Sequence, residues 1–375
     1  MRILELGKFY PPYHGGMETL LKSWAEGFTR QGATVDCVVS NVRARTECEE
    51  ISGVRVHRMA SLGTLWSVSL CPGYVLSTRR HRADVWHAHF PNPLADLACL
   101  AGPRRTPLVL HYHSDVVRQA AALRLYAPLL RWVLGRAARI VVASPQHIEF
   151  SPWLASRRAQ CEIVPFGINL ERFKLTAAVA EAAARLRAGV GQRTILLNIG
   201  RLVPYKGQRY LIEAARELDA VVWLVGDGPL RLELEAVARQ AGVSDRVIFW
   251  GGVDERQLTA MLHACDVFVL PSITVNEAFG LVQVEAMACG KPVVCCALRS
   301  GVPFVNQHGV TGLVTPPADA SALATALRRL TSDPPLRATF GAAARRRAET
   351  EFEESVMIKR YWSVFERLMA TARTR

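Results

Sequence analysis

The sequence predicts an α/β fold made of two Rossmann-like, doubly wound domains. Short apolar runs typical of buried strands alternate with helical stretches along the whole chain. Gly or Pro follows nearly every run, as expected where strands end in turns. The length of 375 residues exceeds what one compact core usually spans. The predicted strands are residues 3–6, 35–39, 54–57, 85–89, 108–111, 140–143, 195–199, 221–225, 247–250, 267–270 and 292–296.

The domain boundary is expected near residues 172–192, where an Ala- and Arg-rich helical stretch precedes a new apolar strand. We therefore expect an N-terminal domain of residues 1–175 and a C-terminal domain of residues 176–352. Residues 353–375 carry apolar side chains at helical spacing, which predicts a last helix that packs back on the N-terminal domain.

The composition indicates an ordinary globular protein. Half of the residues are hydrophobic, yet no apolar run reaches the roughly 18 residues of a membrane-spanning helix. The N-terminal apolar run is too short for a signal peptide, so we expect a cytoplasmic protein. The nine cysteines are odd in number and contain no Cys-x-x-Cys pair, which argues against a disulfide framework or a zinc site.

The formal net charge of +13 is concentrated in the first half of the chain. Residues 1–190 contain 24 Lys and Arg against 14 Asp and Glu, whereas residues 191–375 contain 22 against 19. This surplus favours an anionic partner such as a membrane surface, a lipid diphosphate or nucleic acid. A solvated basic surface without a partner is the alternative.

Two motifs of the first half follow predicted strands. Gly15 and Gly16 open a predicted helix, where free N–H groups and the missing side chains let a phosphate approach. A tight turn is the alternative interpretation. His111 and His113 stand where the 108–111 strand ends, which is where ligands bind in open α/β sheets. A His there can donate to a phosphate or a sugar hydroxyl, although a single buried His is more often a packed residue.

Two motifs of the second half concern phosphate groups. Arg201 and Lys206 lie on a Gly-bounded loop after a predicted strand and could clamp a diphosphate, Arg bidentately and Lys as a compact charge. An exposed basic loop is the alternative. Gly226 belongs to a Gly-Asp-Gly-Pro turn in which Arg231 stands where a dinucleotide fingerprint needs its third Gly. We therefore predict a turn beside a nucleotide and not an NAD site.

The most specific pattern consists of Glu277 and Glu285, which are separated by seven residues. Glu277 precedes a predicted helix and can meet a sugar ring, while Glu285 lies inside that helix and can accept two ribose hydroxyls. Two surface glutamates are common by themselves. Their combination with a preceding strand and a helix that starts at Gly is what indicates a ligand site. The backbone donors for phosphate would come from Phe279, Gly280, Leu281 and Val282.

Four of these motifs, in this order along the chain, resemble glycosyltransferase family 4, a family of retaining enzymes with the GT-B fold. They are the Gly-Gly loop, the loop of Arg201 and Lys206, the Gly-Asp-Gly-Pro turn and the helix of Glu277 and Glu285. The resemblance covers nearly the whole chain, and it extends to bacterial mannosyltransferases of polysaccharide synthesis. It implies two Rossmann-like domains facing a central cleft, with the acceptor bound by the N-terminal domain and the nucleotide sugar by the C-terminal domain. Phe166 stands where the family usually has Asn, so this position receives no role.

The resemblance also implies catalytic roles. His113 would lie near the donor sugar, Arg201 and Lys206 would neutralise the departing diphosphate, and Glu277 would hold the sugar. Fixed cations at the leaving group favour the transition state, where negative charge builds up. The chain has no Asp-x-Asp, so we expect a metal-independent hexosyltransferase without a required cofactor. The donor-binding residues would be Gly15, Gly16, Gly226, Phe279, Gly280, Leu281, Val282 and Glu285.

The favoured donor is GDP-mannose, with a UDP-sugar as the rival, and the expected acceptor is lipid-linked or an oligosaccharide. Residues 117–140 form a basic amphipathic segment, which suits an anionic membrane at the inner face of the plasma membrane. A core-facing helix with a solvated Arg face is the alternative. No nucleic acid is expected, because aromatic-rich RNA-binding motifs are absent from the sequence. The basic residues of this segment are Arg118, Arg124, Arg131, Arg136 and Arg139.

Four other classes of protein are alternatives to a glycosyltransferase. A nucleotide-sugar epimerase would convert the donor without an acceptor, and a phosphorylase would need free phosphate. A carbohydrate-binding protein without activity need not keep Arg201, Lys206, Glu277 and Glu285 together. An NAD oxidoreductase is disfavoured by the missing third Gly.

Overall fold

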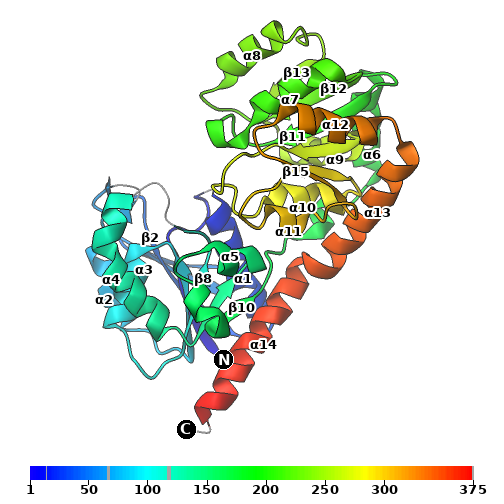
Figure 1. Cartoon of the computed structure of the whole chain (residues 1–375). Helices are drawn as coiled ribbons and strands as arrows, with labels where there is room; N and C mark the ends of the chain where they lie inside the picture. The colour runs from blue at the N-terminus through cyan, green and yellow to red at the C-terminus, as the bar shows by residue number, and fades with distance from the viewer. Residues whose placement is uncertain (14, 66–67, 116–119, 374–375) are drawn as a thin grey trace. The chain divides into compact units, whose positions relative to one another are not determined.

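The structure is a computed structural model that describes residues 1–375 except 14, 66–67, 116–119 and 374–375. The chain forms two compact units (Figure 1). Unit 1 comprises Met1–Phe166 and Glu354–Arg375, and unit 2 comprises Gly167–Glu353. The C-terminal helix thus belongs to the same unit as the N-terminal half of the chain, and it packs against the first helix of that unit.

Unit 2 begins earlier than the expected boundary at residue 176, because the linking segment packs onto its helices and its C-terminal end. The Ile168 N–H donates to the Phe352 carbonyl at 2.9 Å. His263 donates through Nε2 to the Phe173 carbonyl, also at 2.9 Å. These two hydrogen bonds tie the linking segment to unit 2.

Unit 1 is built on an eight-stranded sheet in the order β10-β9-β8-β7-β1-β2-β4-β3, in which only β3 runs antiparallel to its neighbour. A separate small hairpin is formed by β5 and β6. The strands are β1 (Arg2–Leu6), β2 (Thr34–Ser40), β3 (Glu47–Ile51), β4 (Val54–Met59), β5 (Thr64–Leu65), β6 (Val68–Ser69), β7 (Val85–Phe90), β8 (Leu108–Tyr112), β9 (Arg139–Val142) and β10 (Cys161–Ile163). The helices are α1 (Gly16–Arg30), α2 (Pro72–Thr78), α3 (Pro93–Ala101), α4 (Ala120–Arg136), α5 (Pro145–Phe150), the 3-10 helix η1 (Ala155–Gln160) and α14 (Glu354–Arg373).

The two faces of this sheet differ in character because successive side chains of a strand point to opposite faces. Leu4 and Trp86 belong to an apolar cluster with Tyr74 of α2 and Leu130 of α4. The opposite face carries a buried layer of polar side chains under α1 and α14. This layer contains Glu5, His87, His89 and His111, and the aromatic rings that cover it are Trp24, Phe28, Tyr361 and Phe365.

Unit 2 contains a six-stranded, wholly parallel sheet in the order β13-β12-β11-β14-β15-β16. This is the strand order of a doubly wound nucleotide-binding fold. The strands are β11 (Thr194–Ile199), β12 (Ala220–Val225), β13 (Val247–Gly251), β14 (Val267–Leu270), β15 (Val293–Cys296) and β16 (Gly312–Thr315). The helices are η2 (Leu170–Phe173), α6 (Ala177–Ala188), η3 (Pro204–Lys206), α7 (Gln208–Ala214), η4 (Ala215–Glu217), α8 (Arg231–Gln240), α9 (Glu255–Ala264), α10 (Leu281–Ala288), α11 (Val302–Val305), α12 (Ala320–Thr331) and α13 (Pro334–Glu351).

None of the helices in the described parts of the chain combines the length and the apolarity needed to cross a bilayer. The predicted basic segment of residues 117–140 is not a single helix. Helix α4 ends at Arg136, whose guanidinium donates to the Pro103 and Thr106 carbonyls. Strand β9 begins at Arg139, whose side chain pairs with Glu162. Arg118 lies outside the described residues.

Candidate active site

The strand order reverses at one place in each sheet, and ligands of open α/β sheets bind at the carboxyl ends of the strands there. In unit 2 this place lies between β11 and β14. The loop after β11 carries Arg201 and Lys206, and the loop after β14 carries Glu277. The sequence-predicted residues of the second half therefore flank the expected ligand position of their own domain.

Lys206 and Glu277 form an ion pair between these two loops. Lys206 Nζ lies 2.6 Å from Glu277 Oε2, and each side chain is only 11% exposed. The Ser272 hydroxyl donates to the same carboxylate oxygen at 2.9 Å. The structure thus places a compact cation and a hydrogen-bonded carboxylate in direct contact. Arg201, by contrast, is exposed, and no carboxylate in the described part of the chain lies within ion-pair distance of it.

The loops after β11 and β12 approach so closely that glycine is required. A Cβ on Gly226 would lie 2.3 Å from the Gly200 carbonyl oxygen, and Gly226 has a φ of +122°. Gly207 adopts the left-handed conformation, and a Cβ there would lie 2.1 Å from the Pro271 oxygen. Gly226 therefore has a demonstrated packing role, and its predicted contact with a nucleotide stays a prediction.

The helix α10 begins directly after Gly280, which is in the left-handed conformation with a φ of +72°. Phe279 is buried and packs edge-on against Phe352, with 5.9 Å between the ring centroids. Its side chain therefore has a structural role, whereas backbone N–H groups of the first turn, at Leu281 and Val282, are the donors that a phosphate could use.

Glu285 lies one turn after Leu281 on the same face of α10. The side chain is half-buried. Burial raises the pKa of the Glu285 carboxyl to about 7, while nearby Arg172 opposes and Glu255 adds to the shift. The ionised form of such a carboxyl group is stabilised by added hydrogen-bond donors or positive charge, which a ligand could supply.

In unit 1, His113 follows β8 and is buried in the polar layer described above. Its Nε2 lies 3.4 Å from His89 Nδ1, and His89 Nε2 lies 2.8 Å from Glu5 Oε2. The other oxygen of Glu5 lies 2.9 Å from His87 Nδ1. The structure therefore links the predicted His113 to a fully buried carboxylate through one imidazole.

The charges of this network follow from its surroundings. Burial alone would raise the pKa of Glu5, but His87 and His89 hold it down to about 2. Burial and neighbouring histidines lower the pKa of His89 to about 4 and that of His113 well below its usual range. An ionised Glu5 only accepts, so His89 donates through Nε2 and accepts through Nδ1. His113 must then donate from Nε2, which leaves Nδ1 as an acceptor.

His111, the other predicted His of this motif, is buried in the same layer, where its Nδ1 contacts the hydroxyl of Tyr361 from α14. Burial, with the neighbouring histidines, lowers its pKa well below the usual range. This side chain therefore serves the packing of α14 on the sheet.

The predicted phosphate site at the start of α1 has mixed support. Nothing in the described residues lies within 4 Å of a Cβ placed on Gly16, so this helix end is open. A Cβ on Gly15, however, would meet the Glu18 carboxylate at 2.2 Å. Glu18 already places negative charge at the positive end of α1 and would compete with a phosphate. The assignment of Gly15 and Gly16 stays a prediction.

Two adjoining hollows of about 420 and 280 Å³ lie where β1, β2 and β4 end in unit 1. Phe9 and Tyr13 line both, and their rings are stacked with centroids 4.3 Å apart. Arg58 holds the loop beneath them by donating to the Tyr10 and Pro11 carbonyls and to Glu49. Aromatic faces with a rim of polar groups suit the alternating C–H and O–H groups of a sugar.

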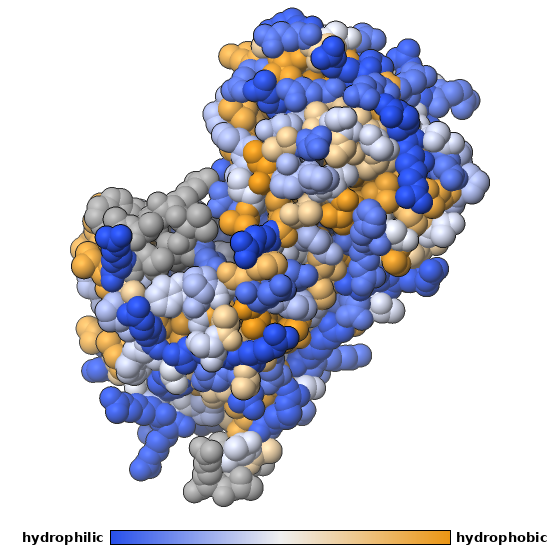
Figure 2. Space-filling model, viewed as in Figure 1, coloured by the Kyte–Doolittle hydropathy of each residue, from blue (hydrophilic) through white to orange (hydrophobic). Residues whose placement is uncertain are grey.

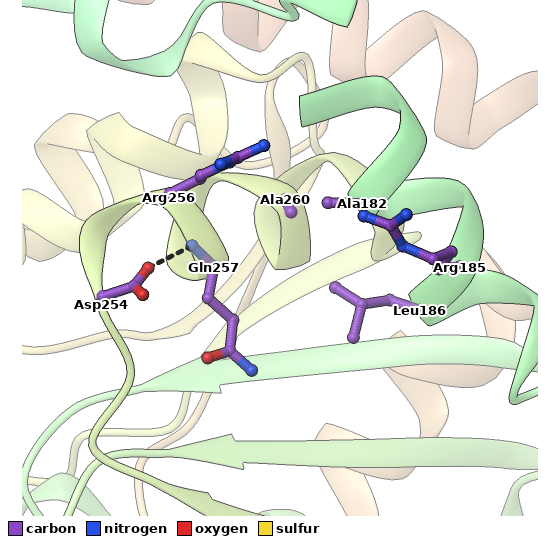
Figure 3. A pocket seen from close by; sticks show the side chains of 7 residues that line it. All are labelled: Ala182, Arg185, Leu186, Asp254, Arg256, Gln257 and Ala260. Atoms are coloured by element: carbon purple, nitrogen blue, oxygen red, sulfur yellow. Dashed lines mark hydrogen bonds between the residues drawn. The ribbon is translucent and has the colours of Figure 1, made fainter. Parts of the chain in front are cut away.

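A further hollow of about 450 Å³ lies in unit 2 between α6 and α9 (Figure 3). Arg185 and Leu186 of α6 and Arg256 and Gln257 of α9 line it. None of the sequence-predicted site residues is among its lining residues.

Two family models match the chain. The model described as Glycosyltransferase Family 4 matches residues 14–172, and the model described as Glycosyl transferases group 1 matches residues 186–347. A GDP-mannose-dependent alpha-(1-6)-phosphatidylinositol monomannoside mannosyltransferase of Mycobacterium tuberculosis is 30% identical over 92% of this chain and 92% of its own length. The chain belongs to glycosyltransferase family 4.

This family 4 glycosyltransferase is also 29% identical to O-antigen chain mannosyltransferase C of Escherichia coli, over 98% of this chain and 99% of the relative. Its fold is GT-B, as in sucrose-phosphate synthase from Thermosynechococcus elongatus, with a TM-score of 0.78 and 24% identity over 99% of both chains. Anabaena Alr3699/HepE in complex with UDP has a TM-score of 0.77 at 23% identity, over 98% of this chain and 100% of that one. Identities this low show a shared fold alone.

Sequence reasoning about this glycosyltransferase missed Glu5, His87, His89 and Ser272. A usable signal existed for the first three. A lone carboxylate stands among the apolar residues of the first strand, and histidines recur at every second position of a strand that should be wholly buried. Ser272 gave no comparable signal, because its contact with Glu277 depends on how one loop folds back.

Proposed function

We propose that this glycosyltransferase moves mannose from GDP-mannose onto a lipid-linked or oligosaccharide acceptor in cell-surface polysaccharide synthesis, with retention of the anomeric configuration and without a metal. The contact between Lys206 and Glu277 at the switch point of unit 2 carries the proposal. The names of the relatives support mannose and GDP-mannose, since one is a GDP-mannose-dependent mannosyltransferase and another is an O-antigen mannosyltransferase.

In this proposal the bound donor separates Lys206 from Glu277 and gives each of them a new partner. Lys206 and Arg201 bind the diphosphate as two cations, and Glu277 accepts hydrogen bonds from sugar hydroxyls. The first turn of α10 donates to the phosphate, and Glu285 accepts from the ribose. Two cations beside the diphosphate stabilise the negative charge that builds up on the leaving group. In unit 1, Nδ1 of His113 is left as an acceptor, and the expected role of this residue at the donor sugar stays a prediction.

The acceptor is assigned to unit 1, in the adjoining hollows over Phe9 and Tyr13. Tyr13 is 45% exposed and stacks on the less exposed Phe9, so its free face is available to a sugar ring. Asn41 and Glu49 at the rim offer donors and acceptors for hydroxyl groups. This chemistry favours a glycosyl acceptor over an unsubstituted lipid.

We further propose that the enzyme is cytoplasmic and associates with the anionic inner face of the plasma membrane. The helices α2, α3 and α4 of unit 1 expose leucines beside arginines, and hydrophobic patches lie next to hydrophilic residues over this region (Figure 2). Leu125 on α4 is 88% exposed and follows the exposed Arg124. Buried apolar side chains and basic residues together bind anionic surfaces more strongly than either alone. The exposed leucines are Leu76, Leu97, Leu100 and Leu125.

The decisive experiment is a donor screen on the purified chain. GDP and GDP-mannose should raise the melting temperature, because a ligand that binds only the folded state stabilises it. With an alkyl α-mannoside as acceptor, GDP-mannose should give an α-linked product by NMR, and the rate should not change in EDTA.

Three results would contradict parts of this proposal. Stabilisation by UDP or ADP sugars and not by GDP-mannose would show that the donor carries a different nucleotide. A β-linked product would exclude retention. Conversion of GDP-mannose into another sugar nucleotide without acceptor would indicate an epimerase.

A further inference from the structure

Three metal-capable side chains converge on unit 1 outside the groups used above. Asp36 Oδ1 lies 2.9 Å from His57 Nε2 and 3.6 Å from His81 Nδ1. One ligand atom from each of the three residues lies within 4.8 Å of the others. The side chains are 14%, 20% and 15% exposed, in the order Asp36, His57 and His81, so they are held in place yet reachable from solvent.

The fold brings these residues together from three elements. Asp36 pairs with Arg55 in the register of β2 and β4, and His57 follows two residues later on the same face of the sheet. This is the face covered by α2, since Val38, which shares the orientation of Asp36, packs with Tyr74 of α2. His81 follows α2 in the turn that closes that helix, where its N–H donates to the Thr78 carbonyl. Two strands and a helix end thus fix the cluster.

We propose that Asp36, His57 and His81 form a binding site for a divalent transition-metal ion, with Zn²⁺ as the expected ion. Two imidazoles and one carboxylate are a donor set that Zn²⁺ and its neighbours in the first transition row prefer. Donors at Zn–N and Zn–O distances of about 2.0–2.2 Å are about 3–3.5 Å apart around a tetrahedral ion. The two distances to Asp36 already lie close to this spacing, so small side-chain movements complete the site and water supplies the fourth ligand.

Arg55 places a positive charge next to the proposed metal site. Its guanidinium donates to Asp36 Oδ2 at 2.9 Å, and the side chain is 52% exposed. The contact uses the carboxylate oxygen that does not face the histidines, so it orients Asp36 without blocking Oδ1. Its positive charge nevertheless weakens the attraction of Asp36 for a cation.

A second metal-capable group, formed by Glu5, His87 and His89, is a poorer candidate. It is fully buried, and each oxygen of Glu5 already accepts from one histidine in the network that reaches His113. This group lies under α1 and α14, on the opposite face of the sheet from Asp36. An entering ion would have to cross packed side chains and break two buried hydrogen bonds.

The test uses the tag-free full chain after treatment with EDTA and its removal. Zn²⁺ alone is titrated in a calorimeter, and Co²⁺ is titrated separately as a spectroscopic probe. We expect one equivalent to bind, to raise the melting temperature and to give visible Co²⁺ absorption. His57→Gln and His81→Gln should each weaken binding at least about 10-fold. Arg55→Gln should bind more tightly than the wild type, because it removes the opposing charge.

Controls separate this site from general metal uptake. His308→Gln, at an exposed histidine of unit 2, should bind like the wild type. His81→Cys should restore Co²⁺ binding with a thiolate charge-transfer band, which shows that a misfolded site is not the cause of the loss. Absence of saturable binding to the wild type, or wild-type binding in the double variant of His57 and His81, would overturn the proposal.

Discussion

Lys206 Nζ and Glu277 Oε2 are 2.6 Å apart, although the two residues lie 71 positions apart in the chain. The contact joins the loops that follow β11 and β14, the two strands between which the sheet of unit 2 reverses its order. An ion pair that is mostly shielded from water holds both groups in one orientation.

Glu277→Gln should lower kcat for mannosyl transfer by about 100-fold or more, because the sugar and Lys206 lose a charged acceptor at the reacting centre. The amide can still accept from Ser272, so the fold should persist. Steady-state kinetics with GDP-mannose, with circular dichroism as the fold check, tests this. Transfer at the wild-type rate would remove Glu277 from the catalytic groups.

Glu285→Gln should change how stability depends on pH. The pKa of Glu285 is raised from 4.5 to about 7 in the folded state, so the folded chain binds the extra proton between these values. Its contribution to stability is complete below about pH 4.5 and is lost as the pH rises through about 7.

The melting temperature of Glu285→Gln relative to the wild type should therefore rise between pH 5 and pH 8, by at least about 2–4 °C. Thermal unfolding of both proteins at these two pH values measures it. A difference that stays constant across this range would show that Glu285 titrates normally. The variant should also bind GDP more weakly if the carboxylate accepts from the ribose.

Glu5→Gln should lower the free energy of unfolding by about 2–3 kcal/mol, because a buried carboxylate that accepts from two histidines is replaced by a group with one acceptor. The stability that the wild type gains from Glu5 is present above about pH 4.5 and is lost as the pH falls toward about 2. Urea unfolding at pH 7 and at low pH measures both effects. The matched control is Glu50→Gln, at an exposed position on β3. Equal effects of the two substitutions would refute the network.

Tyr13→Ala should raise the KM for a mannoside acceptor by about 10-fold, since it removes the exposed face of the aromatic pair, and stacking contributes about 0.5–1.5 kcal/mol beyond burial. Tyr13→Phe keeps the ring and should behave like the wild type. Donor hydrolysis without acceptor should not change in either variant. A rise in the KM for GDP-mannose alone would instead place Tyr13 at the donor.

Leu125→Glu should reduce co-sedimentation with vesicles that contain anionic lipid, because it puts a charge where an apolar side chain would enter the interface. Leu232→Glu is the control, since Leu232 is 78% exposed on α8 of unit 2 and lies outside the proposed surface. Wild-type binding that does not depend on anionic lipid would count against membrane association.

The fold class and the family could be predicted from the sequence because both depend on local patterns. Apolar runs with turn residues at their ends predicted the parallel strands, and the β11 and β12 runs agree closely with the structure. The short edge strands β3, β10 and β16 were not predicted, since their hydrophobic patterns are weak and their pairing depends on neighbours. Unit 2 starts at Gly167, before the expected start at residue 176, and the contact of Phe173 with His263 shows that this difference depends on residues distant in sequence.

The residue types of the candidate donor site were determined by the sequence itself, because Gly-bounded loops and helix starts are local features that follow strands. Tertiary structure alone decided which of these groups meet. The pairing of Lys206 with Glu277 requires two loops 71 positions apart to end at the same edge of a sheet. The link from Glu5 to His113 likewise requires three strands in register, with one face closed by a C-terminal helix. Long-range contacts of this kind follow from strand order and burial, which no short stretch of sequence encodes.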